Sequence, residues 1–212
     1  MRTPSILIAL LLTTTSAWAH GEEGKYYVQF GVGPVFSDPV DNVPDGAGTI
    51  DFDTGYAASL AFGRHVPFSE RFGLNVEVEG YYQYFTVDEK DILAIPSAVE
   101  DDATALVFFL NGLLEWHFTP TFSIYGGGGI GWANSVDYDA WDSGSLNQVD
   151  KDALAYQGRF GFDYALGDDY DVLLGYRYFR TDAIEIEDTT SSDTTEIDIG
   201  QHVLELVFRW GL

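Results

Sequence analysis

The chain has 212 residues, 23 glycines, no cysteine and a formal net charge of −24. The lack of cysteine excludes disulfides, thiolate metal sites and thiol catalysis. The acidic balance argues against nucleic-acid binding and against docking to anionic lipid through basic residues. The length is sufficient for one domain with a full core.

Residues 1–19 have the features of a secretory signal peptide. Arg2 gives a positive start, Ile6–Leu12 is an apolar core, and Ala17–Ala19 has the small-x-small form of a cleavage site. The apolar run is far shorter than the roughly 20 residues that a spanning helix needs. We therefore expect export through the Sec pathway, with residues 20–212 forming the mature domain.

Eight stretches of the mature chain alternate with the period of two that is typical of β-strands. The expected strands are Lys25–Phe36, Phe52–His65, Phe72–Phe85, Thr104–Phe118, Phe122–Ala133, Leu154–Leu166, Tyr170–Thr181 and Gln201–Leu212. The fourth is apolar almost all round and could by periodicity be a buried helix, but its polar residues keep to alternate positions. The fifth is rich in glycine, which suits a narrow barrel whose lumen is filled by neighbouring side chains.

The links between these stretches alternate in length. Short turns are expected at Val66–Arg71, Thr119–Thr121 and Gly167–Asp169, and long acidic links at Ser37–Asp51, Thr86–Ala103, Asn134–Asp152 and Asp182–Glu196. Long loops at one end and tight turns at the other are typical of outer-membrane barrels. The pattern predicts an all-β, eight-stranded antiparallel transmembrane β-barrel, an up-and-down meander with long extracellular loops, short periplasmic turns and both termini in the periplasm. A soluble barrel such as a lipocalin is the alternative.

Charged residues of both signs fall on the strand face that is expected to line the lumen. Buried charges persist when they are paired and hydrogen-bonded, and the planar guanidinium of arginine can bridge two carboxylates. We interpret the set as a salt-bridged plug, with a narrow gated ion path as the alternative, since eight strands leave an interior that side chains just fill. Glu77, Glu79, Arg159, Arg177 and Glu205 are expected near mid-barrel, and Glu115, Asp163 and Arg209 lower.

The four long links carry most of the remaining acidic residues and few basic ones. Asp88, Glu89 and Asp91, for example, lie close together in the second link. One interpretation is a solvated, self-repelling surface, adapted to a saline habitat. The other is binding of divalent cations by oxygen ligands, with bridging to lipopolysaccharide phosphates. No calcium loop of twelve residues with the required spacing is present.

The four histidines do not point to an enzyme. His20 is at the mature terminus, His65 and His117 are expected at periplasmic strand ends, and His202 is expected to face lipid near the outer rim. None has a serine two residues on, as a lipid A deacylase barrel would require. Acyl transfer needs a nucleophile, a base and an orienting acid together, and the sequence does not indicate such a set. We therefore expect no catalysis, no cofactor and no metal site, with a lipid A-modifying enzyme as a remote alternative.

Several runs resemble the OmpA-like and opacity-like outer-membrane β-barrel family over about the whole mature chain. They are EVEGYYQY at Glu77–Tyr84, Asn111, IYGGGGIGWA at Ile124–Ala133, AYQGRFGFDYAL at Ala155–Leu166 and LLGYRYF at Leu173–Phe179. The resemblance implies a Gram-negative outer-membrane location and lumenal polar strand positions. It implies no wall-tethering role, since no peptidoglycan-binding domain follows the barrel. The OmpW family, associated with small hydrophobic molecules, is the second resemblance, carried weakly by HGEEGKYYVQFGVG.

The resemblance also implies partners. The terminal residue is Leu212 where the family usually has Phe, so recognition by the barrel-assembly machinery is expected to rest on Phe208 and Trp210 together with Leu212. Periplasmic chaperones, outer-membrane lipid and lipopolysaccharide are the other expected partners. The expected role is structural or surface-interactive. An OmpW-like barrel that passes small hydrophobic molecules, or a narrow gated channel, is the alternative.

Overall fold

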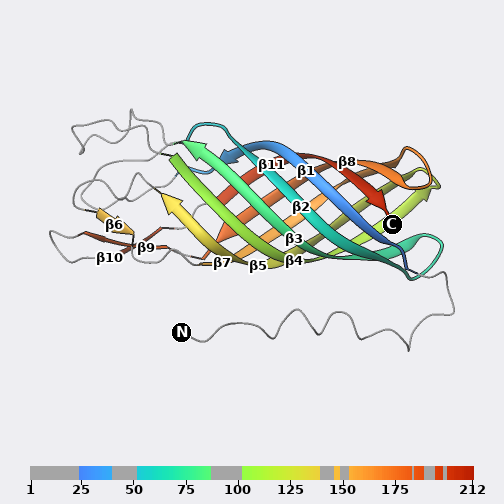
Figure 1. Ribbon diagram of the computed structural model, residues 1–212, viewed down its shortest axis with the longest axis horizontal. Coiled ribbons are helices and arrows are strands. Elements are labelled where there is room, and N and C mark those ends of the chain that lie inside the picture. Colours follow the sequence, from blue (N-terminus) through green and yellow to red (C-terminus); the bar gives the residue numbers. More distant parts are fainter. Residues whose placement is uncertain are drawn as a thin grey trace.

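In the computed structural model, the described residues are 24–39, 52–86, 102–138, 146–148, 153–182, 184–188, 194–197 and 200–212. Within them a closed barrel has the strand order β1-β11-β8-β7-β5-β4-β3-β2, with every pair antiparallel (Figure 1). The barrel strands are β1 (Tyr26–Ser37), β2 (Gly55–Pro67), β3 (Phe72–Thr86), β4 (Asp102–Thr119), β5 (Phe122–Tyr138), β7 (Ala153–Ala165), β8 (Tyr170–Thr181) and β11 (Gly200–Gly211). The predicted eight-stranded meander is therefore confirmed.

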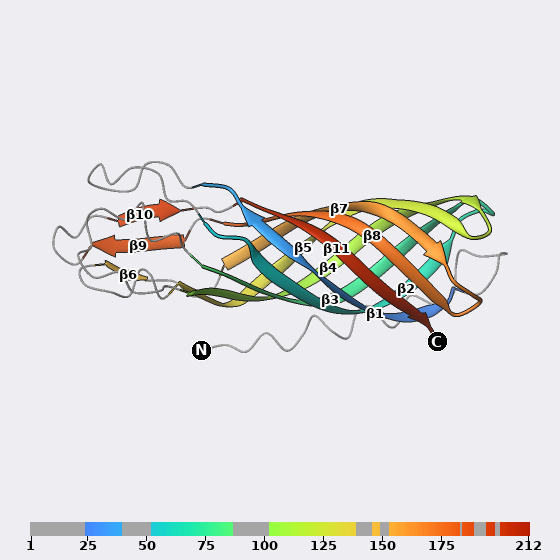
Figure 2. The same cartoon turned by 90° about the horizontal axis from the view of Figure 1, so that it is seen from above.

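The strands run obliquely to the long axis of the barrel (Figure 2). They are 12 to 18 residues long, and a tilted strand needs only about 9–11 residues to cross a bilayer. The stretch that could have been a helix is the strand β4. No helix among the described residues is long and apolar enough to cross a membrane. The start of β1 and the C-terminus lie together at the end with the short turns, where Leu212 N donates to Tyr26 O (2.9 Å).

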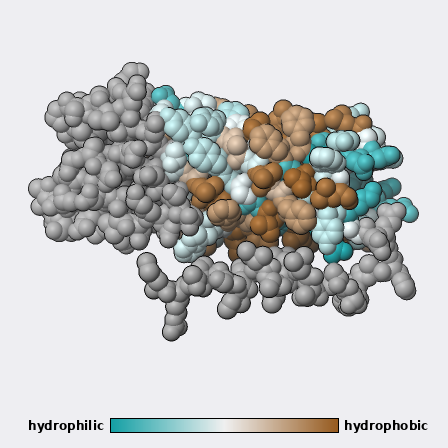
Figure 3. All heavy atoms as spheres, in the orientation of Figure 1, coloured by the Kyte–Doolittle hydropathy of each residue, from teal (hydrophilic) through white to brown (hydrophobic). Residues whose placement is uncertain are grey.

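The two faces of the barrel wall differ in the way that the alternation predicts. Along β7 the side chains alternate: one is buried in the lumen and the next is exposed on the outside. The exposed set is apolar and large, and includes Leu60 (60% exposed), Leu114 (60%) and Phe160 (59%). Figure 3 shows hydrophobic side chains gathered over the middle of the wall on the face in view. An apolar surface of this extent is unsuited to water and fits the hydrocarbon core of a membrane, which rules out the soluble alternative.

Stacked aromatic rings mark the short-turn end of the outer surface. Phe72 stacks on Trp116 (ring centroids 5.8 Å apart), and Trp116 packs against Phe118 (4.3 Å). On the other side of the barrel Tyr170 stacks on Trp210 (5.9 Å). Such girdles lie at the membrane–water interface of outer-membrane barrels.

Glycines on the inner face make room for neighbouring side chains, as the sequence predicts. A Cβ atom at Gly129 would lie 1.9 Å from Asn111 Oδ1, and one at Gly131 would lie 2.5 Å from the Phe109 ring. Both glycines belong to the glycine-rich strand β5 and face residues of β4. The glycine-rich strand therefore lets side chains of the next strand fill the lumen.

The long links differ in part from what the sequence predicts. The strand β5 continues to Tyr138, five residues beyond the expected end at Ala133. Three short strands form a separate sheet of order β10-β9-β6 beyond the barrel: β6 (Leu146–Gln148), β9 (Ile184–Asp188) and β10 (Thr194–Ile197). The sequence predicted long acidic links here and did not predict these short strands within them. The alternation in Ile184–Asp188 was present but lay in a segment too short and acidic to cross a membrane.

Candidate functional site

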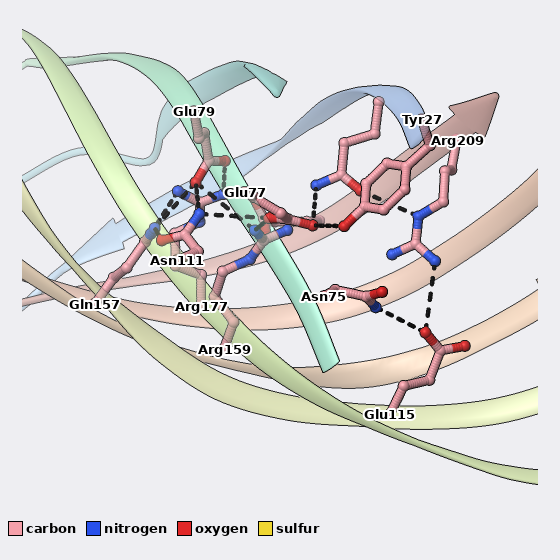
Figure 4. A network of polar contacts seen from close by, with 12 residues as sticks. Tyr27, Asn75, Glu77, Glu79, Asn111, Glu115, Gln157, Arg159, Arg177 and Arg209 are labelled. Carbon is pink, nitrogen blue, oxygen red and sulfur yellow. Dashed lines mark hydrogen bonds and ion pairs between the residues drawn. The ribbon is translucent and has the colours of Figure 1, made fainter. Parts of the chain in front are cut away.

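A layer of charged side chains crosses the lumen at mid-barrel (Figure 4). Arg177, from β8, has no exposed surface. Its Nη2 atom lies 2.6 Å from Glu79 Oε1 and 2.7 Å from Glu205 Oε1, so one nitrogen bridges carboxylates of β3 and β11. The guanidinium also lies over the Tyr81 ring, 4.3 Å from its centroid. Arg177 therefore ties opposite walls of the barrel together through contacts shielded from water.

Arg159, the second arginine of the layer, pairs across the strands with Arg177. Two like charges directly opposite each other repel, and the carboxylates of the layer offset that repulsion. Arg159 Nη1 donates to Glu77 Oε2 (3.0 Å), and Arg159 Nε lies 3.5 Å from Glu205 Oε2. Glu205 is thus shared by both arginines.

Neutral donors complete the layer, which contains three carboxylates but only two arginines. Glu77 Oε1 accepts from the Tyr27 hydroxyl (2.8 Å) and from Gln29 Nε2 (3.0 Å). Glu79 Oε2 accepts from Asn111 Nδ2 (2.8 Å) and from Gln157 Nε2 (2.9 Å). Glu77 and Glu79 therefore each have neutral hydrogen-bond donors besides an arginine, which helps to keep their charges buried. Glu205 depends on the two arginines.

Apolar side chains pack on both sides of the charged layer. Toward the long-loop end, the rings of Tyr81, Phe109 and Phe179 meet edge to face or tilted, with centroids 5.6 to 6.3 Å apart. Toward the short-turn end, the lumen is filled by a buried cluster of Leu113, Tyr125, Leu173 and Val207. All seven are at most 4% exposed. The charges therefore lie between two packed layers, where their interactions are stronger than in water.

A second charged layer lies closer to the short turns. Arg209 Nη1 donates to Asp163 Oδ2 (2.7 Å) and lies 3.9 Å from Glu115 Oε2. Glu115 also accepts from Asn75 Nδ2 (2.7 Å). This layer has one arginine for two carboxylates.

Two histidines flank Glu115 at the mouth of the lumen. His65 Nδ1 and His117 Nδ1 each lie 3.6 Å from a Glu115 oxygen, and their rings are 5.7 Å apart. Their side chains are 24% and 32% exposed, so the mouth is wetter than the mid-barrel layer. In the described part of the chain, no group of three or more His, Asp or Glu residues is placed to hold a metal ion.

The eight charged residues singled out from the sequence are buried in the lumen. The mid-barrel layer holds Glu77, Glu79, Arg159, Arg177 and Glu205, and the layer near the short turns holds Glu115, Asp163 and Arg209. The neutral partners Tyr27, Gln29 and Asn75 were not predicted from the sequence as members of the network. Their positions in the strand alternation place them on the inner face, and that signal could have found them. The residues proposed as the C-terminal signal, Phe208, Trp210 and Leu212, are 52%, 56% and 70% exposed on the outer face.

The acidic links fall largely outside the described residues, including Asp88, Glu89 and Asp91. Asp38, in the first long link, is an acidic residue that the structure describes. Its Oδ1 lies 3.1 Å from His202 Nε2, and His202 Nδ1 is within hydrogen-bonding distance of the Tyr176 hydroxyl. This carboxylate–imidazole–phenol chain lies on the outer wall, and the sequence alone did not bring the three residues together.

The fold is similar to that of solved outer-membrane proteins. With Neisserial surface protein A the TM-score is 0.54 at 12% identity, covering 89% of this chain and 99% of that one. With OprG of Pseudomonas aeruginosa it is 0.53 at 17% identity, covering 88% and 96%. With AlkL in lipid bilayers it is 0.52 at 19% identity, covering 93% and 94%. At these identities the likeness shows the fold alone.

No curated protein matches the chain significantly. Residues 5–209 match the outer membrane protein beta-barrel domain family, which agrees with the closed barrel and its apolar outer wall. The family match, together with the apolar outer wall, indicates an outer-membrane location. The chain therefore belongs to the outer membrane protein beta-barrel domain family.

Proposed function

We propose that this protein is a small integral barrel whose lumen is permanently plugged and whose role is structural or at the cell surface, without catalysis. The observation that supports this best is the mid-barrel charged layer, in which Arg177 joins carboxylates from β3 and β11 at zero exposure. Packed apolar and aromatic side chains lie above and below this layer. The rival function, a narrow gated channel, would need this layer to come apart.

Breaking the layer would be costly. Removing one partner of a buried ion pair leaves an uncompensated charge, at about 3–5 kcal/mol. A gate that opens during normal function would need to supply at least that free energy. The OmpW-like alternative, passage of small hydrophobic molecules, meets a second obstacle, because Tyr81, Phe109 and Phe179 fill the lumen on the long-loop side.

Conductance of the pure protein in planar bilayers tests the proposal. We expect no steady channels, and we expect Arg177→Ala to produce small, fluctuating conductance because the layer loses its bridge. Large, steady channels from the unaltered protein would refute the plugged lumen. Incubation with lipopolysaccharide followed by mass spectrometry tests for lipid modification, and a mass change in the lipid would refute the absence of catalysis.

The proposed partners follow from the surfaces. The apolar wall would contact outer-membrane lipid and lipopolysaccharide, and the acidic links would be solvated or bind divalent cations. The exposed Phe208, Trp210 and Leu212 would be read by the assembly machinery after Sec export and delivery by periplasmic chaperones. Replacing Trp210 and Phe208 with alanine should lower the amount of folded barrel in the outer membrane. Unchanged assembly would contradict that role.

A further inference from the structure

The mouth of the lumen at the short-turn end holds more carboxylates than arginines. Glu115 and Asp163 share Arg209, which lies 3.9 Å and 2.7 Å from their oxygen atoms. Asp171 adds a third carboxylate on the inner face, because it is paired with Arg209 across β8 and β11 and is partly exposed. Three carboxylates therefore face one arginine as long as the histidines at the mouth are neutral.

Two histidines approach Glu115 from different strands. His65, near the end of β2, has its Nδ1 atom 3.6 Å from Glu115 Oε2, and His117, near the end of β4, has its Nδ1 atom 3.6 Å from Glu115 Oε1. Each carboxylate oxygen thus has an imidazole of its own. Both rings are partly exposed, so protons from the surrounding water can reach them.

A glycine of β3 makes room for one of these rings. Gly73 pairs with Pro67 of β2 on one side and with Glu115 of β4 on the other. A Cβ atom at Gly73 would lie 2.2 Å from Cε1 of His65. The His65 ring therefore lies over this glycine, across β3, in a position that a side chain at residue 73 would occupy.

Hydrogen bonds determine where the His65 ring takes a proton. Asn75 Nδ2 donates to Glu115 Oε2 (2.7 Å; Figure 4), and Asn75 Oδ1 faces His65 Nδ1 (2.8 Å). An amide oxygen only accepts, so Nδ1 carries a hydrogen, and Nε2 is the atom that binds the next proton. His117 Nδ1 bonds the Ser123 hydroxyl (2.9 Å). A hydroxyl can donate or accept, so this contact is compatible with a neutral or a protonated ring.

We propose that His65, Glu115 and His117 form a proton-binding site that tightens the mouth of the lumen as the pH falls. Both rings are neutral above about pH 7, and below about pH 6 both are protonated and form ion pairs with Glu115. The unfolded chain lacks these pairs, so the folded barrel gains stability as the pH falls through the range in which histidine titrates. The pair between His65 and Glu115 also ties β2 to β4 across β3.

The other charged groups around the mouth come from the remaining strands and the β2–β3 turn: Lys25, Arg71, Asp163, Asp171 and Arg209. Lys25 and Arg71 are exposed. The inward phenols of Tyr27 and Tyr125 stay neutral in this pH range. Asp163 is the competing proton acceptor, because it lies buried in the same layer. A test must therefore separate the histidines from this carboxylate.

Histidine-ring NMR of the folded mature protein in lipid nanodiscs, followed from about pH 5 to pH 8, tests the site. Glu115→Gln removes the shared charge and keeps the size of the side chain. We expect the titration midpoints of His65 and His117 to fall by about half a pH unit to one unit, a threefold to tenfold loss of proton affinity. His202, which pairs with Asp38 at the other end of the barrel, is the internal control and should keep its midpoint. Asp38→Asn should move the midpoint of His202 alone.

Urea unfolding in one lipid or detergent gives a second readout. The unfolding equilibrium constant of the unaltered protein should be about threefold to tenfold smaller at pH 5.5 than at pH 7.5. The double variant His65→Gln, His117→Gln should lose most of this gain. His202→Gln is the matched control and should keep most of it, because the pair of His202 with Asp38 is exposed.

Three results would overturn the proposal. The first is that Glu115→Gln leaves the midpoints of His65 and His117 unchanged, or moves that of His202 equally. The second is a gain of stability at low pH that persists in the double variant, which would assign the proton to Asp163. Should the variants fail to fold, the unaltered protein still decides the matter. An unfolding equilibrium constant that does not decrease from pH 7.5 to pH 5.5 would exclude the site.

Discussion

The two charged layers of the lumen use the same kinds of side chain at different depths. In the mid-barrel layer Arg177 and Arg159 share Glu205, and each also binds another carboxylate, with exposures of 3% or less for both arginines. In the layer near the short turns a single arginine serves Asp163 and Glu115, and Glu115 is also flanked by two partly exposed histidines and the Asn75 amide. Because the mid-barrel layer lies deeper and away from the wetter mouth, we expect it to depend more strongly on its arginines than the layer near the short turns.

The largest effect is expected at Arg177. Arg177→Ala removes the bridge between Glu79 and Glu205 and leaves both carboxylates without their strongest partner. The free energy of unfolding should fall by about 3–5 kcal/mol. Urea unfolding in one detergent or lipid measures it. Stability equal to that of the unaltered protein would mean that water reaches the layer and solvates the charges.

A smaller effect is expected at Arg209, in the layer near the short turns. Arg209→Ala leaves Asp163 and Glu115 without their arginine, but Glu115 keeps the Asn75 amide, and the mouth admits water. We expect a loss of about 1–3 kcal/mol, the cost of an unsatisfied group with partial solvation. The same urea series measures it. A loss as large as that of Arg177→Ala would contradict the contrast between the layers.

A glycine substitution tests whether the packing around the mid-barrel layer is tight. A Cβ atom at Gly129 would collide with Asn111 Oδ1 and displace an amide that bonds Glu79. Gly129→Ala should therefore cost about 1–3 kcal/mol, as overpacking typically does. Gly158, which faces outward and has nothing within 4 Å of a Cβ position, is the matched control, and Gly158→Ala should not destabilise the barrel. Equal behaviour of the two variants in thermal unfolding would show a loosely packed lumen.

The smallest effect is expected outside the barrel lumen. Asp182 is exposed at the end of β8, and Asp182→Asn should change the free energy of unfolding by no more than about 0.5 kcal/mol. Neutralising Asp188 or Asp193 in the same link should have as little effect. A large loss in any of these variants would indicate a bound cation or an ion pair at the link. Unfolding with and without a chelator would distinguish the two.

The barrel could be predicted from the sequence because successive side chains of a β-strand point to opposite faces of the sheet. This alternation predicted that Glu77, Glu79, Arg159, Arg177 and Glu205 point into the lumen. The alternation of long and short links predicted which end of the barrel carries the loops and which carries the turns. The alternation of inward and outward side chains does not determine which carboxylate an arginine contacts, because long side chains cross the lumen between strands far apart in sequence. Glu79 and Arg177 are 98 residues apart.

Other features depended on geometry that alternation does not encode. Asp38, His202 and Tyr176 meet only because β1, β11 and β8 are adjacent and their outward side chains lean along the strands. The short strands β9 and β10 lie beyond the apolar wall, where the membrane no longer imposes a minimum length, and so their brief alternation gave a weak signal.

A double-mutant cycle between Arg177 and Glu205 tests the central claim, a dry and ion-paired lumen, most directly. The free energies of unfolding of Arg177→Ala, Glu205→Ala and the double variant give the coupling between the two side chains, whose atoms lie 2.7 Å apart. The same cycle for Arg209 and Asp163, also 2.7 Å apart, is the comparison. We expect a coupling of about 2–3 kcal/mol for the mid-barrel pair and a smaller one for the pair near the mouth. A mid-barrel coupling below about 0.5 kcal/mol, the range of exposed pairs, would contradict the plugged lumen.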